Sequence, residues 1–214
     1  MRRIILICFI LLPISSHADL NFNYGSGIAA KTDYAERSLI TSMEKVGDRI
    51  YAVGVHGIII FSDNSGESWS QADYVPYQNT ITDISCTSEK MCWATGHDAT
   101  ILHSNDGGLN WVKQYEDYDF DAPLLSIHMY DDKEGIAIGA FALSLRTANG
   151  GESWDYLFLD DDEYQPHLNY VYGDNQAWRK SAKDEGYAVG EIGKYYISDD
   201  RGLNWLVVDT GYFG

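Results

Sequence analysis

Apolar residues along the chain gather into short runs that are separated by polar turns containing glycine. The clearest set of four runs is Ile81 to Cys86, Met91 to Thr95, Thr100 to His103 and Trp111 to Tyr115. The third run of the other sets reads GIIIFS, ALSLRT or KYYIS, which is rich in the β-branched and aromatic residues of strands. No segment shows the 3.6-residue apolar period of an amphipathic helix. The pattern therefore predicts an all-β protein built from short strands.

An eight-residue pattern, Ser/Thr-x-Asp/Asn-x-Gly-x-x-Trp, occurs four times, each time between the third and fourth runs. A glycine stands eight residues before each Ser or Thr, and the tryptophans lie 42, 43 and 51 residues apart. The longer last step is explained by a polar insertion around Asp174 to Glu185. The pattern residues are Ser62, Asn64, Gly66, Trp69, Ser104, Asp106, Gly108, Trp111, Thr147, Asn149, Gly151, Trp154, Ser198, Asp200, Gly202 and Trp205.

Each residue type in this pattern suits a turn between two strands. The Asp or Asn accepts backbone N–H groups, the Ser or Thr supplies a second local hydrogen bond, and the glycine takes a positive φ. The tryptophan begins the fourth strand and supplies a large apolar surface for packing. We interpret the pattern as a structural turn rather than a ligand-binding loop.

Four strands in roughly 40 to 45 residues match one blade of a β-propeller. We expect four recognisable blades of four antiparallel strands each, at about residues 39–75, 81–117, 124–160 and 168–209 within the repeat region 39–214. Residues 19–38 precede the first blade. Four blades can close into a small ring, whereas a shortened or incomplete propeller would form an open arc. An arc exposes blade faces, so self-association that completes the ring is a candidate interaction.

The eight-residue pattern resembles the Asp-box, also called the BNR repeat. The run YAVG followed by GIIIFS and the box is similar to photosystem II stability and assembly factor-like propellers over Leu39 to Asp209. That resemblance implies a non-enzymatic scaffold that assists the assembly of a membrane protein complex. Photosynthetic members contact their partner through clustered arginines. The arginines here share no register, so no partner-binding residue carries over: Arg37, Arg49, Arg146, Arg179 and Arg201.

The N-terminus reads as a cleaved signal peptide over residues 1–18. Arg2 and Arg3 precede the apolar run Ile4 to Ile14, and Ser16 to Ala18 offers small residues for cleavage. The apolar run is shorter than the about 20 residues of a membrane-spanning helix. We therefore expect a periplasmic or secreted protein without a transmembrane anchor in the mature chain.

Net charge limits the classes of partner, and the cysteines predict a disulfide. The formal net charge of −17 disfavours nucleic acid and anionic lipid, which bind through Lys and Arg. Cys86 and Cys92 flank a polar turn between two predicted strands. In an oxidising compartment they are expected to form a disulfide.

No catalytic constellation, cofactor site or metal site is evident, and the Arg-Ile-Pro of sialidases is absent. Three alternatives stay open: hydrolysis of glycosides by a pair of carboxylates, carbohydrate stacking on the four box tryptophans, and calcium binding. Calcium would use the acidic clusters Glu116 to Asp121 or Asp160 to Glu163. The histidines lack metal-ligand spacing: His56, His97, His103, His128 and His167.

Overall fold

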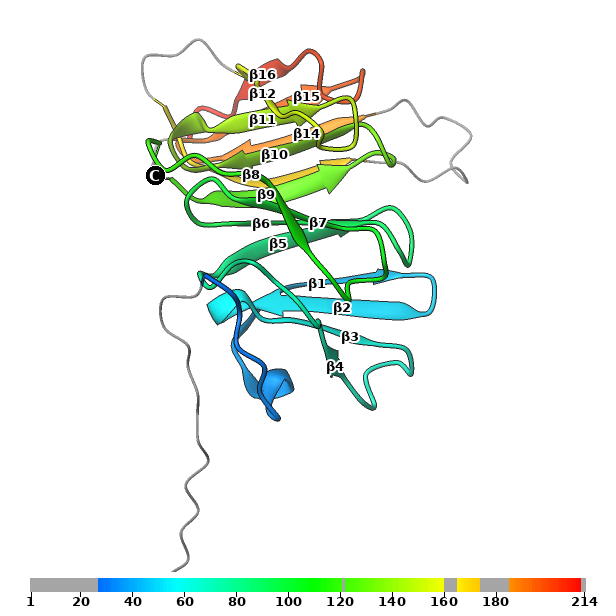
Figure 1. Cartoon of the computed structure of the whole chain (residues 1–214). Helices are drawn as coiled ribbons and strands as arrows, with labels where there is room; N and C mark the ends of the chain where they lie inside the picture. The colour runs from blue at the N-terminus through cyan, green and yellow to red at the C-terminus, as the bar shows by residue number, and fades with distance from the viewer. Residues whose placement is uncertain (1–26, 121, 160–164, 174–184, 213–214) are drawn as a thin grey trace, which may run out of the picture.

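The computed structural model describes residues 27–120, 122–159, 165–173 and 185–212. Its strands form four separate antiparallel sheets of four strands, which confirms the predicted class of fold (Figure 1). The predicted signal peptide lies outside the described residues.

Every sheet is paired in chain order, so each is one blade. The first blade holds β1 (Ile40–Val46), β2 (Arg49–Gly54), β3 (Ile59–Ser62) and β4 (Ser70–Gln71). The second holds β5 (Ile81–Cys86), β6 (Cys92–Gly96), β7 (Ile101–Ser104) and β8 (Val112–Tyr115). The third holds β9 (Leu124–Met129), β10 (Gly135–Gly139), β11 (Ser144–Thr147) and β12 (Asp155–Tyr156). The fourth holds β13 (Leu168–Gly173), β14 (Gly186–Gly190), β15 (Lys194–Ser198) and β16 (Leu206–Asp209).

Three short 3-10 helices complete the described structure. They are η1 (Ala35–Arg37), η2 (Val55–Gly57) and η3 (Ala140–Ala142). The last two join the second strand of a blade to its third. In all four blades the ladder between the first two strands shifts register next to the glycine that closes the second strand, as a β-bulge does.

Neighbouring blades pack face to face through three apolar clusters. Tyr51 of the first blade lies in one cluster with Trp111 of the second, and Trp93 of the second lies in another with Trp154 of the third. The third cluster joins Ile136 of the third blade to Trp205 of the fourth. Each of these box tryptophans therefore faces the preceding blade.

Polar contacts fix the first strands of adjacent blades against one another. Thr41 donates its hydroxyl to the carbonyl of Ile81, and Thr82 donates to that of Leu124, each over 2.6 Å. The buried carboxylate of Asp83 accepts the hydroxyls of Ser42 and Ser126, both at 2.7 Å, and so ties three blades together.

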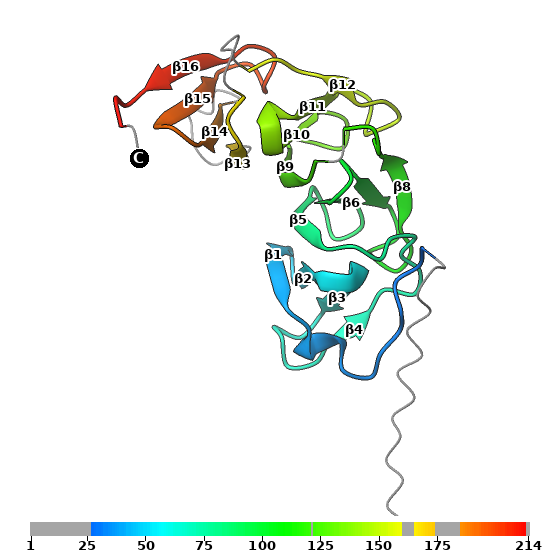
Figure 2. The ribbon, with the colours of Figure 1, turned by 90° about the vertical axis from the view of Figure 1, so that its left-hand side faces the viewer.

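The four blades form an open arc, so the alternative of a closed four-bladed ring is wrong. Figure 2 shows the first and fourth blades at opposite ends of the arc. The outer face of the first blade is covered at its centre by the segment that carries η1, where Ala35 packs with the buried Ala52 and Ile60.

Candidate functional site

The Asp-box turns have one hydrogen-bonding scheme in all four blades. The Ser or Thr hydroxyl donates to the Asp or Asn side chain over 2.9 Å and accepts the N–H of the box glycine over 2.8 to 3.0 Å. The Asp or Asn also accepts the backbone N–H of the residue just before the tryptophan, as Asp106 does from Asn110 over 3.0 Å. All four glycines have positive φ, from 77° to 89°. We infer that the boxes serve the fold.

The box tryptophans are not arranged as a sugar-stacking platform. Trp111 is fully buried and Trp154 is nearly so, whereas Trp69 and Trp205 are partly buried. The indole N–H of Trp111 and that of Trp205 each donate to the carbonyl of their own box glycine over 3.0 Å. Their ring faces are used in packing between blades.

The two cysteines lie opposite each other in the second blade. Cys86 ends β5, Cys92 begins β6, and the structure joins their sulfur atoms in a disulfide. The bond closes the turn over residues 87–91 at one end of the hairpin.

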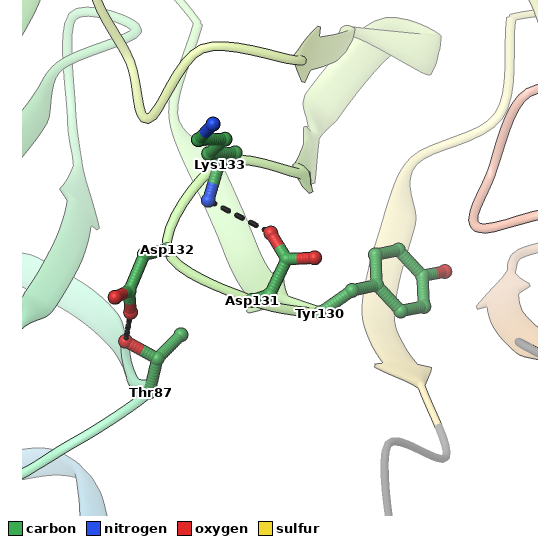
Figure 3. Close-up of a pocket in the computed structure, with 5 residues that line it drawn as sticks. All are labelled: Thr87, Tyr130, Asp131, Asp132 and Lys133. Atoms are coloured by element: carbon green, nitrogen blue, oxygen red, sulfur yellow. Dashed lines mark hydrogen bonds between the residues drawn. The ribbon is translucent and has the colours of Figure 1, made fainter.

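A cavity of about 460 Å³ opens between the β5–β6 turn and the β9–β10 turn, as Figure 3 shows. Its lining residues are Thr87, Tyr130, Asp131, Asp132 and Lys133. Asp132 accepts the hydroxyl of Thr87, and Asp131 accepts the backbone N–H of Lys133 over 2.8 Å (Figure 3). Asp131 also accepts a hydrogen bond from Arg201 of the fourth blade over 2.7 Å.

Through these contacts, the carboxylates of Asp131 and Asp132 hold turns of neighbouring blades together. Burial raises the pKa of Asp131, but the N–H groups of Glu134 and Lys133 and the charge of Arg201 outweigh it, so that the pKa is lowered. An ionised carboxylate held in this way cannot act as a general acid at neutral pH. The cavity lies at the seam between the second and third blades, and the carboxylate of Asp132 holds that seam together.

A second pair of acids, Glu44 and Asp83, lies on the inner strands of the arc. Burial raises the pKa of Glu44 to about 7; the N–H of Cys86 opposes this shift and the charge of Asp83 adds to it. Glu44 accepts that N–H over 2.6 Å, and the carboxylate of Asp83 accepts hydrogen bonds from the hydroxyls of Ser42 and Ser126. A raised carboxyl pKa is typical of functional sites, but here both acids bridge neighbouring strands.

The acidic clusters show no metal site within the described residues. Asp117 accepts the hydroxyl of Tyr156 over 2.7 Å and the N–H of Asp119 over 3.0 Å, and Glu116 pairs with Lys113. No group of three or more His, Cys, Asp or Glu side chains in the described ranges could hold a metal ion. Asp121 and the cluster Asp160 to Glu163 lie outside them.

The described arginines are all used in ion pairs. Arg49 pairs with Asp63 at 2.6 Å, Arg146 with Glu134 at 3.0 Å, and Arg201 with Asp131 and Glu134. Arg37 lies 3.9 Å from Glu36, while Arg179 falls outside the described residues.

The outer face of the fourth blade carries a continuous set of exposed or partly exposed apolar and aromatic side chains, which we call the end face. The strand pairings place them on one side of the sheet, in register across all four strands. They are Tyr170, Tyr172, Tyr187, Val189, Tyr195, Ile197, Leu206 and Val208. The opposite side, with Val171, Ala188 and Tyr196, packs against the third blade.

Comparison with the other blades shows what kind of surface the end face is. Val189 is 45% exposed, whereas the residues at its position in the first three blades, Val53, Thr95 and Ile138, are at most 1% exposed. In those blades the next blade covers the position. The end face thus has the composition of an interface between blades while it remains open to solvent.

Sequence reasoning did not single out the end face. The repeat itself contained a signal, because aligning the second strands on their closing glycines puts Val189 in register with three core positions.

The described residues include no helix long and apolar enough to cross a bilayer.

Residues 71–206 match the protein family described as photosynthesis system II assembly factor YCF48. A photosystem II stability/assembly factor, HCF136, of Arabidopsis thaliana is 31% identical over 114 residues, which are 51% of this chain and 26% of that protein. The photosystem II assembly protein Ycf48 of Synechococcus sp. (strain JA-2-3B'a(2-13)) is 30% identical over 141 residues, which are 64% of this chain and 39% of the relative. The chain thus spans less than half the length of these relatives.

Solved propellers share the fold. The structure of YCF48 bound to D1 peptide superposes with a TM-score of 0.61 at 19% identity, covering 81% of this chain and 55% of that one. An ancestral GH74 enzyme gives a TM-score of 0.61 at 17% identity, covering 78% of this chain and 24% of its own. The superposition thus covers about half of the first propeller.

Proposed function

Because the chain belongs to the photosynthesis system II assembly factor YCF48 family, we propose that it is an exported, non-enzymatic scaffold. In this proposal it assists the assembly or stability of a membrane protein complex in the cell envelope by docking a client protein. The relatives' names support an assembly role, and one solved relative, YCF48, is bound to a D1 peptide. The predicted signal peptide supports export to the periplasm or beyond.

The structural observation that supports the proposal most directly is the end face. Soluble proteins rarely leave a contiguous apolar patch of this kind on their surface unless another molecule covers it. Aromatic side chains, above all tyrosine, are enriched where proteins bind one another, since they bury a large area and keep a polar group for hydrogen bonding. We propose that an apolar surface of the client covers the end face, with a further blade or a second copy of this chain as the alternative occupant.

Hydrolysis of glycosides is the weaker function for this chain. The likeness to GH74 enzymes is below 25% identity and concerns the fold alone. The inner acids Glu44 and Asp83 accept hydrogen bonds from groups of neighbouring strands. Three of the four box tryptophans, Trp111, Trp154 and Trp205, pack between blades. None of these groups is placed to flank a sugar.

A complementation experiment tests the proposal. In the producing organism, deletion of the gene should deplete the assembled form of one membrane complex, as seen by native electrophoresis of envelope extracts. The wild-type chain and a Tyr34→Lys control should restore that complex, whereas Val189→Lys should not, although it melts like the wild type. Restoration by Val189→Lys, or a deletion that leaves every complex intact, would overturn the proposal.

A further inference from the structure

A small groove lies on the face of the arc that carries the connections between blades, beside the third blade. Its volume is about 120 Å³, and its rings come from Phe120, Phe141, Tyr156 and Phe158. Leu143 and Pro166 contribute to its walls. A cavity of about 150 Å³ can hold a benzene molecule, so this smaller groove has room for one apolar side chain of moderate size.

The groove is unusual because its aromatic rings are open to solvent. Phe158 is 89% exposed and Phe141 is 51% exposed. Phe120 and Tyr156 are also exposed, with ring centroids 6.5 Å apart. Single exposed apolar residues are common on proteins, but a cluster around a concavity marks a binding surface.

The turn at Phe141 does not require an aromatic side chain. Phe141 has φ of 55° in the turn after β10, a conformation that bulky residues avoid. The corresponding turns place His56, Asp98 and Ile192 at this position with φ of 58°, 56° and 53°. The first two blades thus make the same turn with polar residues. The phenyl ring is half exposed, and its other half packs against the ring of His167, with the two ring centroids 4.8 Å apart.

The acidic residues beside the groove indicate the charge of the ligand that it can bind. None of the residues that line it is charged. The carboxylate of Asp117 lies beside the groove, where it accepts the hydroxyl of the lining residue Tyr156 over 2.7 Å. That hydroxyl, with the N–H groups of Phe120 and Asp119, outweighs a slight effect of burial and lowers the pKa of Asp117. Asp119 follows two residues later on the same exposed connection. The rim of the groove is therefore negative at neutral pH, on a chain of net charge −17.

We propose that this groove binds a basic, apolar segment of a polypeptide. One branched apolar side chain enters between Phe141 and Phe158, and a neighbouring Lys or Arg reaches Asp117 and Asp119 at the rim. The face of Tyr156 can also receive that cation, since cations are attracted to aromatic faces. Opposite charges across such a contact raise the association rate and select the partner. The groove lies on a different surface from the end face, so this inference does not rest on the proposed function.

Calorimetric titration with synthetic peptides tests the inference. One probe is an eight-residue peptide with a pair of leucines flanked by lysines, and the second has glutamates in place of the lysines. The lysine peptide should bind and the glutamate peptide should not. Asp117→Asn with Asp119→Asn should weaken binding severalfold, and so should raising the salt concentration.

The double variant Phe141→Asn, Phe158→Ser removes two aromatic rings of the groove and uses residues that both positions can accept. Asparagine tolerates the left-handed conformation at 141, and residue 158 is exposed. This double variant should melt like the wild type and bind the lysine peptide at least tenfold more weakly. Tyr34→Ser, an exposed aromatic residue on the N-terminal segment, is the matched control and should bind unchanged.

Three results would overturn the inference. They are equal binding of the lysine and glutamate peptides, undiminished binding by the double variant, and binding of a cello-oligosaccharide in place of either peptide. Failure of Val189→Lys to lose function in the complementation experiment would leave the inference intact, because residue 189 lies on the end face.

Discussion

Gly108 of the second blade lies against the ring of Tyr51 from the first. A Cβ atom added at Gly108 would stand 2.6 Å from Cε1 of Tyr51, and the backbone there has φ of 79°. The box glycine thus forms the turn and also lets the preceding blade approach closely. Gly66 of the first blade has a similar φ of 89° but meets only Trp69, at 3.7 Å.

This pair of glycines separates backbone strain from packing between blades. Gly66→Ala should cost about 1 to 2 kcal/mol, the usual penalty for an L-residue in the left-handed region. Gly108→Ala should cost a further 1 to 3 kcal/mol, because the methyl group overpacks the interface. Urea unfolding of both variants measures the difference. Equal losses would show that the close approach to Tyr51 contributes nothing.

The hydroxyl of Ser104 is predicted to support its turn. It accepts the N–H of Gly108 over 3.0 Å at a fully buried position, so Ser104→Ala leaves that donor without its partner. We expect a loss of about 1 to 3 kcal/mol in the free energy of unfolding. Asn105→Ala, at the exposed neighbouring position, is the control and should change stability by less than about 0.5 kcal/mol. A Ser104→Ala chain as stable as this control would contradict a structural role for the box.

The disulfide between Cys86 and Cys92 is predicted to stabilise the folded protein. Replacing both cysteines by alanine should cost about 2 kcal/mol, the chain-entropy estimate for so short a loop. Reduction of the wild type should bring its melting temperature down to that of the variant. Titration of free thiols in the purified, oxidised protein provides the check, and two reactive thiols would mean that the bond does not form.

Glu44 should make stability depend on pH. Burial raises its pKa from 4.5 to about 7, so the folded chain keeps a proton that the unfolded chain releases between these values. The stability contributed by this group is fully present below about pH 4.5 and is lost as the pH rises through 7.

Glu44→Gln removes this titration while its amide oxygen can still accept the N–H of Cys86. Relative to the wild type, the variant should gain on the order of 2 kcal/mol between pH 4.5 and 7.5. Thermal melts over this range measure the gain, with Glu67→Gln in an exposed turn as the control. A stability difference between Glu44→Gln and wild type that is constant with pH would contradict the raised pKa.

Local features of the fold could be predicted from the sequence because they depend on nearby residues. The strand expected at Ile81 to Cys86 coincides with β5, and the box glycines have the positive φ that the turn requires. The spacing of the boxes was enough to divide the chain into four blades, because each blade is one sheet of consecutive strands.

Burial of a strand face depends on what lies beyond it, which the local sequence does not contain. Residues 51–54 and 187–190 both read YAVG, yet Tyr51 and Val53 are fully buried while Tyr187 and Val189 are 38% and 45% exposed. The aromatic groove was missed for a similar reason. Phe120, Phe141 and Phe158 come from three separate connections, and only the packing of the third blade brings them together.

Photo-crosslinking at position 189 tests the central claim, that the end face docks a client protein. A photoreactive phenylalanine analogue would replace Val189 in the producing organism, with the same replacement at the exposed Tyr34 as the control. The account predicts that irradiation of intact cells joins residue 189, and not residue 34, to one subunit of the membrane complex that the gene deletion depletes. Crosslinks from residue 189 only to another copy of this chain, or equal crosslinking from both positions, would contradict it.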